Sequence, residues 1–548
     1  MQLLQDGKSE SFGYGGDLED KEYVHTTDAQ FCINGIFSPD RKPHPAVSEI
    51  KYLHQPIQLV GDFMSGMKQR RISSRGEDLG FTFINRFHTL SWSDVFVEYF
   101  YSTDDCSGPS GNIDCSAFER NSGKNIETFS YVPMDCNGVE ALPVYTLNRA
   151  RPHLSGNQRC WITFRWFFRS KRSWQGNGRS PKDPISVEKI EIIPSRVNFD
   201  ENGDIERLLR EESSSIRFQE ATGSVEIWVR SNNARYMRKC AVIDKVTGCL
   251  VSYCDRNGTE LFLEPLIPNL TRACTDNDRG GVDRIKGMMP RWVAFKIQLV
   301  ERAFFNYSYW YRWKKLGLDP ESPPEPQCET IKIFQDFEDS VVIDTSMSMK
   351  SPGKETICKL RVVYRFRCDG CVKITVKMEP HSGNLANSAI PTFPRIGFSF
   401  CMNKKLTDVI FLGRGKGENY PDRKAGSETG LWSYLPESRS DYIVPSEHGN
   451  RCDCSWLCCR DNNSTGFLFT AAHDGIGPDH FDFSALLHNQ KELHRATHGC
   501  QLEDRKTGTH PIYVNLDMFN MGIGGDVGWE PCVYNEYLLK PDREYEAR

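Results

Sequence analysis

The residues best suited to contact a ligand lie near the end of the chain, in the segment LDMFNMGIGGDVGWEP at 516–531. Four glycines interrupt an otherwise apolar, strand-like sequence there. Glycine adopts backbone angles with φ > 0 and lets other groups approach the main chain closely. A loop built in this way could present Trp529 to a ligand, but an ordinary turn between two strands explains the same glycines. The segment by itself leaves both interpretations open.

Two groups of cysteines have spacings that metal sites use. Cys368 and Cys371 match one half of a zinc site, but Asp-Gly lies between them and no second pair follows, so we predict a hairpin turn. The run RCDCSWLCCRD at 451–461 is richer in cysteine, lies near His448 and could hold a soft metal. Its alternation around Trp456 and Leu457 favours a strand instead.

Two further patterns suggest chemistry only at first sight. Gly413 to Gly417 reads GRGKG, but the Lys-Ser/Thr ending of a phosphate-binding loop is absent, so we predict a turn. Asn535-Glu536 could be the acid/base dipeptide of a retaining glycosidase. It lies within VYNEYLLKP, which alternates like a terminal strand, and no second carboxylate is placed by a local pattern. We therefore interpret Glu536 as structural.

The composition excludes several classes of partner. The 68 basic and 73 acidic residues are interspersed and give a net charge of −5, which argues against nucleic-acid and membrane-surface binding. The first residues lack a signal-peptide pattern, and no apolar run reaches the ~18 residues of a membrane span. Together with 20 cysteines scattered through strand-like sequence, this predicts a cytoplasmic protein with reduced thiols. Five Asn-x-Ser/Thr triplets keep export and glycosylation open as the alternative.

The chain divides into four parts. Residues 1–57 read as a strand, a glycine-rich loop and a helix that starts at Pro45 with Ala46, Ile50 and Leu53 at helical spacing. Residues 58–199 show the short strands and turns of a β-sandwich, and the polar residues 200–215 read as a linker with one short helical turn. Residues 216–548 are again β-rich.

Within these parts, one hairpin and two loops are specified most clearly. The sequence from Leu360 to Met378 alternates on both sides of Asp369-Gly370, which predicts a hairpin with a two-residue turn and one buried face. The Ser/Gly-rich residues 104–127 predict a long surface loop, and the Pro-rich residues 316–327 predict an exposed excursion.

Eight segments together resemble the C-terminal part of the large β-galactosidases of glycoside hydrolase family two. Long, ordered strings carry this resemblance, and they occur along essentially the whole chain in the order of the family. They are GGDLEDKEYVHTTDAQFCINGIFSPDRKPHPAVSEIKYLHQPI (15–57), INRFHTL (84–90), LTRACTDND (270–278), YWYRWKKLGLD (309–319), GENYPDRKAG (417–426), VPSEHGNRCD (444–453), LHRATHG (493–499) and NMGIGGDVGWEP (520–531).

The resemblance implies a mainly β fold with three parts. Residues 1–57 are similar to the last strand and helix of a catalytic (β/α)8 barrel, and residues 58–199 to an immunoglobulin-like β-sandwich. After the linker, residues 216–548 are similar to the family's large antiparallel β-supersandwich, which is related in fold to galactose mutarotase.

The resemblance also implies an activity and its site residues. The family hydrolyses terminal β-galactosides by a retaining mechanism that needs two carboxyl groups about 5–5.5 Å apart. Both glutamates and the magnesium ligands belong to the part of the family that precedes this sequence, so we expect no catalytic residue and no cofactor in this chain, and no activity from it alone. Trp529 matches a substrate-contacting tryptophan. Phe31 and Asn34 match two ligands of a sodium ion, whose third protein ligand also lies upstream.

Three functions follow as hypotheses. The chain is part of a β-galactosidase whose galactoside substrate binds only to the complete enzyme, as a possible homo-oligomer because family members are often tetramers. Alternatively it is a non-catalytic carbohydrate-binding or scaffold module. The third possibility is a small subunit that complements a separate catalytic chain.

Overall fold

The computed structural model describes two compact units of the chain. The described residues are 3–5, 10–14, 17, 35–60, 69–72, 82–89, 94–103, 127–129, 160–168, 184–194, 215–230, 236–255, 257–280, 308–336, 340–353, 355–380, 392–415, 417–436, 442–463, 465–472, 477–526 and 532–548. The larger unit comprises Met1–Val47, Leu208–Arg423 and Ser433–Arg548, and the smaller unit comprises Ser48–Arg207 and Lys424–Trp432. Each unit is described by itself below.

The larger unit is built on long antiparallel sheets. One sheet has nine strands in the order β10-β11-β12-β13-β14-β19-β26-β25-β22, and another has five in the order β15-β16-β17-β18-β27. A third sheet contains β20-β23-β24. The strands of the nine-stranded sheet are β10 (Ser215–Glu220), β11 (Ser224–Arg230), β12 (Arg238–Asp244), β13 (Leu250–Tyr253), β14 (Phe262–Asn269), β19 (Arg395–Met402), β26 (Ile512–Asn520), β25 (Phe481–Leu486) and β22 (Arg451–Cys454). The others are β15 (Glu325–Asp336), β16 (Ser340–Lys350), β17 (Thr356–Arg367), β18 (Val372–Pro380), β27 (Tyr545–Ala547), β20 (Asp408–Gly415), β23 (Trp456–Arg460) and β24 (Gly466–Thr470).

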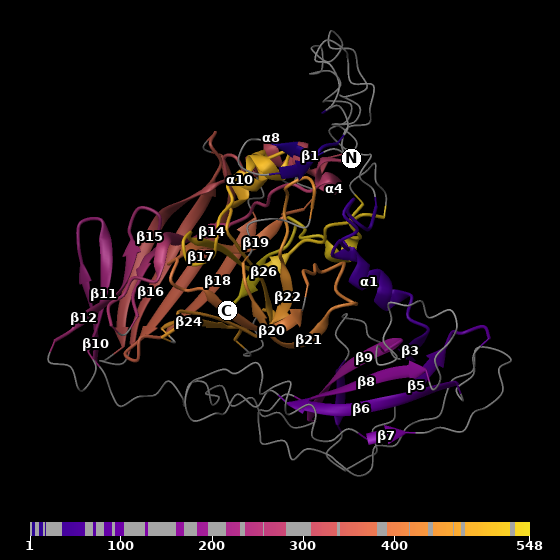
Figure 1. The fold of residues 1–548 in the computed structure, drawn as a ribbon. Helices are drawn as coiled ribbons and strands as arrows, with labels where there is room; N and C mark the ends of the chain where they lie inside the picture. Colours follow the sequence, from indigo (N-terminus) through magenta and orange to yellow (C-terminus); the bar gives the residue numbers. More distant parts are fainter. Residues whose placement is uncertain are drawn as a thin grey trace, which may run out of the picture. The chain divides into compact units, whose positions relative to one another are not determined.

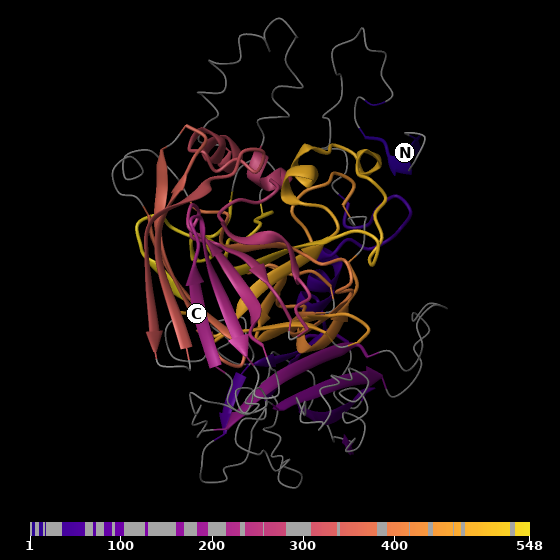
Figure 2. The same cartoon turned by 90° about the vertical axis from the view of Figure 1, so that its left-hand side faces the viewer.

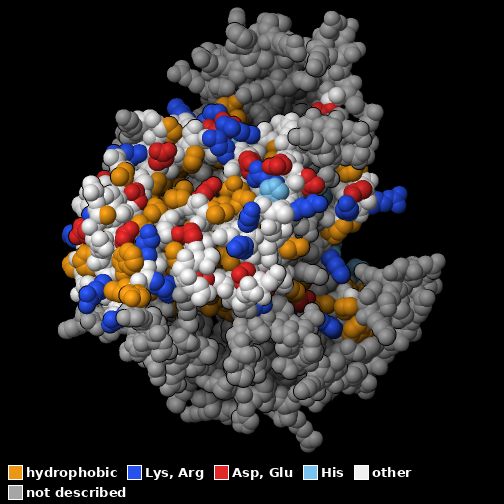
Figure 3. Space-filling model, turned by 60° about the vertical axis from the view of Figure 1, so that its left-hand side comes forward, with side chains coloured by type: hydrophobic (Ala, Val, Ile, Leu, Met, Phe, Trp, Pro, Cys, Tyr) orange, Lys and Arg blue, Asp and Glu red, His pale blue; other side chains and the backbone are white. Residues whose placement is uncertain are grey.

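Short helices gather at one end of these sheets. They are α4 (Asp276–Arg279), α8 (Tyr309–Lys315) and α10 (Gln490–Arg495). The small hairpin of β1 (Leu3–Gln5) and β2 (Glu10–Phe12) lies at the same end (Figures 1 and 2). On the face that Figure 3 shows, the described Lys and Arg side chains are interspersed with Asp and Glu, as the nearly balanced composition predicts.

The predicted hairpin is confirmed, with a correction at its turn. Strand β17 pairs with β18 so that Leu360 faces Met378 and Phe366 faces Val372. The buried side chains of β17 alternate with exposed ones, so the hairpin has one buried face. The backbone N–H of Arg367 donates to Cys371 O at 2.9 Å, which leaves a three-residue turn rather than two. Gly370, at φ 89°, closes that turn because it adopts the left-handed region without strain.

Two predicted turns or excursions are wrong for tertiary reasons. Gly413 belongs to the buried strand β20 and not to a turn. A Cβ at Gly413 would lie 2.5 Å from Cys454 Sγ, so the glycine serves close packing between strands. The Pro-rich segment is not simply exposed, because Leu318 is fully buried and Asp319 is 8% exposed.

The segment around Glu536 also differs from its prediction. Asn535–Tyr537 form a 3-10 turn, η5, and the last strand of the chain is β27 instead. The alternation in VYNEYLLKP arises because Val533 and Leu539 are buried on either side of this turn, while Glu536 is exposed. Glu536 is therefore not part of a strand, and its interpretation as structural stays a prediction.

The cysteine-rich run forms strands, as predicted. Cys452 and Cys454 lie on β22 and Cys459 on β23, and all three are buried. None of the cysteines that the structure describes forms a disulfide. Among the same residues, no three His, Cys, Asp or Glu side chains lie together as a metal site would require.

The smaller unit is a small β-structure with an aromatic core. A five-stranded sheet runs in the order β4-β9-β8-β6-β7, and β3 pairs with β5. The centre of the core is formed by Phe83, with the rings of Phe164 and Trp166 packed edge-on at 5.0 and 5.3 Å. The strands are β3 (Ile57–Val60), β4 (Gln69–Ile72), β5 (Thr82–Asn85), β6 (Val95–Thr103), β7 (Glu127–Phe129), β8 (Cys160–Phe168) and β9 (Ser186–Pro194).

Helix α1 (Ala46–Leu53) and strand β21 (Glu428–Tyr434) have residues in both units. The helix predicted from Pro45 onward is confirmed. Proline suits the entry of a helix because the N–H that it lacks would have no partner within the helix there. Glu49 of α1 accepts hydrogen bonds from the backbone N–H groups of Ala425 and Gly426 at 3.0 and 2.6 Å. The strand expected before α1, the loop at 104–127 and the linker's helical turn lie outside the described residues.

Candidate functional site

The first half of the glycine-rich loop, residues 521–526, is held by a carboxylate. Strand β26 ends at Asn520, and the two oxygens of Asp422 then accept hydrogen bonds from Ile523 N at 3.0 Å and Gly524 N at 2.7 Å. A Cβ at Gly522 would lie 2.5 Å from Asp422 Oδ2, so only glycine allows the carboxylate to approach this closely. The glycines therefore shape a fixed backbone rather than a loose turn.

The opposite side of the loop backbone is held by two donors. Arg272 donates to the carbonyl oxygens of Met521 and Gly522 at 3.3 and 3.1 Å. Asn277 Nδ2 donates to Ile523 O at 2.9 Å. Both donors come from the segment LTRACTDND, about 250 residues earlier in the chain.

Arg272 is itself fixed by a buried ion pair. Its Nε and Nη2 donate to the two oxygens of Asp278 at 3.0 and 2.6 Å, and both side chains are almost fully buried. Burial alone would lower the pKa of Arg272, but the Asp278 carboxylate outweighs this and raises the pKa above its usual value. The guanidinium therefore stays charged and keeps its fork directed at the loop carbonyls.

Helix α4 places Asp278 and Asn277 through its own cap. Thr275 accepts a hydrogen bond from Asp278 N while Asp278 accepts one from Thr275 N, which is a capping box. Ser308, the N-cap of α8, donates to Asp278 O at 3.1 Å. The centre of the Trp313 ring on α8 lies 5.7 Å from the Arg272 guanidinium, so α8 packs against the arginine through a cation–π contact.

Residues near the N-terminus contact the same end of the sandwich. The ring of Tyr14 stacks on that of His498, with centroids 4.5 Å apart, and its hydroxyl donates to Thr497 O at 2.6 Å. His498 Nε2 lies 2.9 Å from Asp17 Oδ2. Burial raises the pKa of Tyr14, so its hydroxyl remains a donor. The segment LHRATHG therefore contacts Tyr14 and Asp17 through stacking and hydrogen bonds.

The predicted site residues are not tested by this geometry. Trp529, Phe31 and Asn34 lie outside the described residues. Sequence reasoning missed Asp422, Arg272 and Asn277, which contact the backbone of the loop. The one local signal was Thr275-x-x-Asp278, whose spacing predicts a capping box.

Comparison with known proteins decides the family. The model described as "Beta galactosidase small chain" matches residues 236–548, more than half of the sequence. The chain belongs to the β-galactosidase small chain family. Residues 2–59 of this family member match "Glycosyl hydrolases family 2, TIM barrel domain". The resemblance and the mainly β fold class with a barrel segment are thereby confirmed, while the exact domain boundaries remain predictions.

Curated relatives match nearly the whole length of this chain. A "Beta-galactosidase" of Enterobacter cloacae is 27% identical, covering 96% of this chain and 42% of the relative. Those of Vibrio cholerae serotype O1 and Lactococcus lactis are 26% and 25% identical and cover 98% and 100% of this chain. The chain spans 42–45% of the length of these relatives.

Structural comparison adds little. Galactose 1-epimerase from Lactobacillus acidophilus NCFM overlaps with a TM-score of 0.20 at 7% identity, covering 56% of this chain and 98% of that chain, and such a score supports no argument about the fold. Among the described residues, no helix combines the length and the apolar character needed to cross a membrane.

A second buried ionic cluster joins Asp517 of strand β26, just before the loop, to Arg395 of β19 and to Glu447. Arg395 Nη2 is 2.6 Å from Glu447 Oε1, and Arg395 Nη1 is 3.5 Å from Asp517 Oδ2, with all three side chains fully buried. These atoms are within ion-pair distance but lack the alignment of hydrogen bonds. Burial raises the pKa of Asp517 from 3.8 to about 7; Arg395 opposes this rise, while Glu447 and Asp482 add to it.

Proposed function

We propose that this chain forms the C-terminal part of a β-galactosidase that hydrolyses terminal, non-reducing β-D-galactosides. Relatives named β-galactosidase match 96–100% of the chain, which supports the proposal. The reaction is a retaining double displacement, in which one glutamate attacks the sugar and a second donates and then accepts the proton. Both glutamates belong to the part of the relatives that this chain does not match.

The chain's own contribution is part of the sugar site. The observation that carries this proposal is the geometry of the loop at 521–526. Three residues from two distant segments bind its backbone and hold it in one conformation. A flat aromatic ring binds the C–H groups of a sugar well, and Trp529 follows five residues after Gly524. We assign Trp529 to substrate binding on this basis and on the family resemblance.

Ion binding is a further part of this proposal. The backbone carbonyl of Phe31 and the side-chain oxygen of Asn34 supply two of the hard oxygen ligands that sodium prefers, and the remaining ligands come from outside this chain. Magnesium belongs wholly to the catalytic portion. We also propose cytoplasmic action, where thiols stay reduced, and a homo-oligomer as the active form.

The proposal is tested with a fusion in which this chain replaces the matched part of the Lactococcus lactis β-galactosidase, called here the completed enzyme. We expect the completed enzyme to release the chromophore from a nitrophenyl galactoside and the chain alone to release none. Turnover by the chain alone contradicts the proposed division of labour. A folded fusion without turnover contradicts the proposed function.

A second candidate is a small subunit that complements a separate catalytic chain. The description of the matching family as a small chain favours it. Mixing this chain with the separately expressed remainder of the relative distinguishes the two arrangements. Activity from the mixture that equals that of the fusion supports a split enzyme, and activity from the fusion alone supports a single polypeptide.

Replacing Trp529 by alanine in the completed enzyme should raise KM for the galactoside about tenfold, because the loss of one stacking contact corresponds to about 1.4 kcal/mol. Thermal unfolding should stay unchanged. Phe334→Ala, which removes a 56% exposed ring from β15, is the control and should leave KM as it was. A KM for Trp529→Ala equal to that of the control removes Trp529 from the site.

A further inference from the structure

We infer that Asp422 is a positioning residue for the sugar-contacting loop, and that it acts by holding the backbone N–H groups of Ile523 and Gly524. The inference rests on the proposed function, because it assigns to Asp422 an effect on galactoside binding through Trp529. Asp422 itself touches the loop backbone and no reacting atom. It lies in the segment GENYPDRKAG, about 100 residues before the loop.

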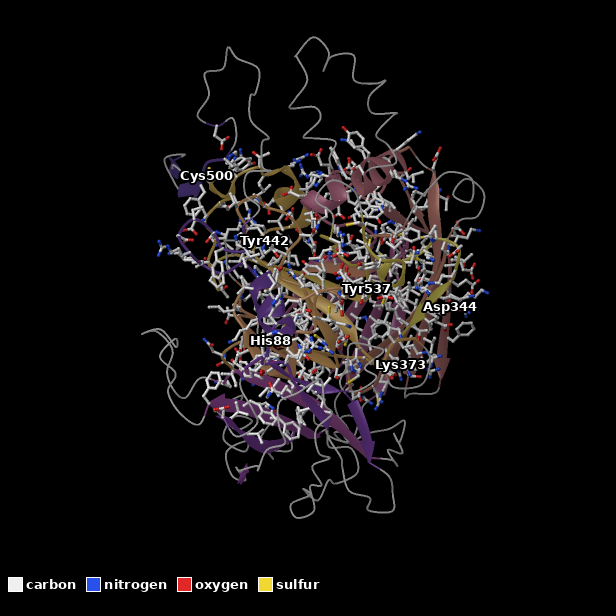
Figure 4. All side chains as sticks on the ribbon, turned by 90° about the vertical axis from the view of Figure 1, so that its right-hand side faces the viewer. His88, Asp344, Lys373, Tyr442, Cys500 and Tyr537 are labelled. Carbon is white, nitrogen blue, oxygen red and sulfur yellow. The ribbon has the colours of Figure 1, made fainter. Side chains whose placement is uncertain are left out.

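The backbone of the loop is held at every successive N–H group from 521 to 524. Met521 N donates to Pro394 O at 3.1 Å, and Gly522 N donates at 3.1 Å to the carbonyl of Tyr537, a residue labelled in Figure 4. The next two N–H groups donate to Asp422, at 3.0 and 2.7 Å. Half of the donors in this stretch therefore depend on one side chain.

The carbonyl side of the same stretch is also fixed. The oxygens of Met521 and Gly522 accept from Arg272, and the oxygen of Ile523 accepts from Asn277. A segment with both sides of its backbone bonded has little freedom, although it belongs to no sheet. Bonds to an ionised carboxylate are about twice as strong as those between neutral groups, so Asp422 supplies the strongest of the N–H contacts.

Asp422 is the position where the loop can be loosened without unfolding the sandwich. Arg272 is fully buried in its ion pair, so its loss affects the fold as a whole. Asp422 is half-buried, and its two contacts to 521–526 are both with loop N–H groups. Trp529 follows Gly524 by five residues, which span at most ~17 Å. A shift of Gly524 therefore shifts the region that Trp529 can reach.

The first test uses the chain itself and hydrogen–deuterium exchange. Asp422→Asn keeps the shape of the side chain but directs an N–H₂ group at one of the two loop donors. We expect the amides of Ile523 and Gly524, which Asp422 holds, to exchange at least tenfold faster than in the unsubstituted chain. Asp408→Asn, which removes the partner of Arg460 on β23, is the matched control and should leave these amides unchanged. Equal exchange in Asp422→Asn and the unsubstituted chain overturns the inference.

The second test is a double-substitution cycle in the completed enzyme. Asp422→Asn should raise KM about fivefold with kcat less affected, and should add nothing to Trp529→Ala, because both changes remove the same contact. Effects that multiply in the double variant overturn the inference while leaving Trp529 in the site. If Trp529→Ala alone has no effect, the proposed sugar contact fails, whereas the exchange experiment still reports whether Asp422 holds the loop.

Discussion

Replacing Arg272 by methionine should lower the free energy of unfolding of the chain by about 4 kcal/mol. The substitution keeps the volume of the side chain and removes its charge, which leaves the Asp278 carboxylate buried without a counter-charge. It also removes the donors to Met521 O and Gly522 O. The shift of the urea midpoint, followed by far-UV circular dichroism, measures the loss.

An exposed ion pair in the same unit provides the control. Arg361 and Asp344 also form a two-pronged contact, but their side chains are 61% and 18% exposed, at the outer side of the sandwich where Figure 4 labels Asp344. Arg361→Met should cost less than about 1 kcal/mol, because solvent screens this pair. Equal midpoints for Arg272→Met and Arg361→Met would show that the buried pair contributes no more than an exposed one.

Raising the pH from 4 to 7 should reduce the stability of the larger unit through Asp517. The unfolded carboxyl releases its proton near its usual pKa of 3.8, whereas the folded one keeps it up to a pKa of about 7. Over this window the folded state binds more protons than the unfolded state, so the free energy of unfolding falls as pH rises. A shift of three pH units corresponds to roughly 4 kcal/mol, most of it present at pH 4 and lost by pH 7.

Asp517→Asn removes the titrating group and should flatten the stability profile between pH 4 and 7. The comparison is the midpoint of urea unfolding at unit steps of pH. Glu418 does not affect the comparison. Burial opposes its ionisation, but Arg423 and the N–H of Gly449 lower its pKa, so its contribution is lost only below its usual value of 4.5, and it is the same in both chains. Parallel profiles for the unsubstituted chain and Asp517→Asn would contradict a proton that the folded state keeps on Asp517.

Local patterns in the sequence predicted the elements whose cause is local. The hairpin from Leu360 to Met378 and the helix after Pro45 follow from alternation and from a helix-entry proline, and the structure has both. The prediction for Gly413 was wrong because its reason is a contact with Cys454, 41 residues away. Composition likewise misplaced Leu318, which packs into the core despite its proline-rich surroundings.

The candidate site was only partly predictable for a related reason. Asp422, Arg272 and Asn277 bind backbone groups of the loop. Every residue has these groups, so the residue types of the loop do not indicate such contacts. Their separation from the loop, up to 250 residues, gives no periodic or motif signal. The family resemblance marked their two segments and the loop as important without indicating that they meet.

The sheet order also bears on when the loop at 521–526 forms during folding. Strand β14, which leads to Arg272, reaches β26 only through β19, so the nine-stranded sheet joins segments that are more than a hundred residues apart. Contacts of such high sequence separation form slowly, because the chain must lose the entropy of large closed loops first. The hydrogen bonds at 521–524 therefore depend on long-range contacts that must be in place before the loop is held. We expect the proposed galactoside contact of this loop only in molecules whose sandwich is complete.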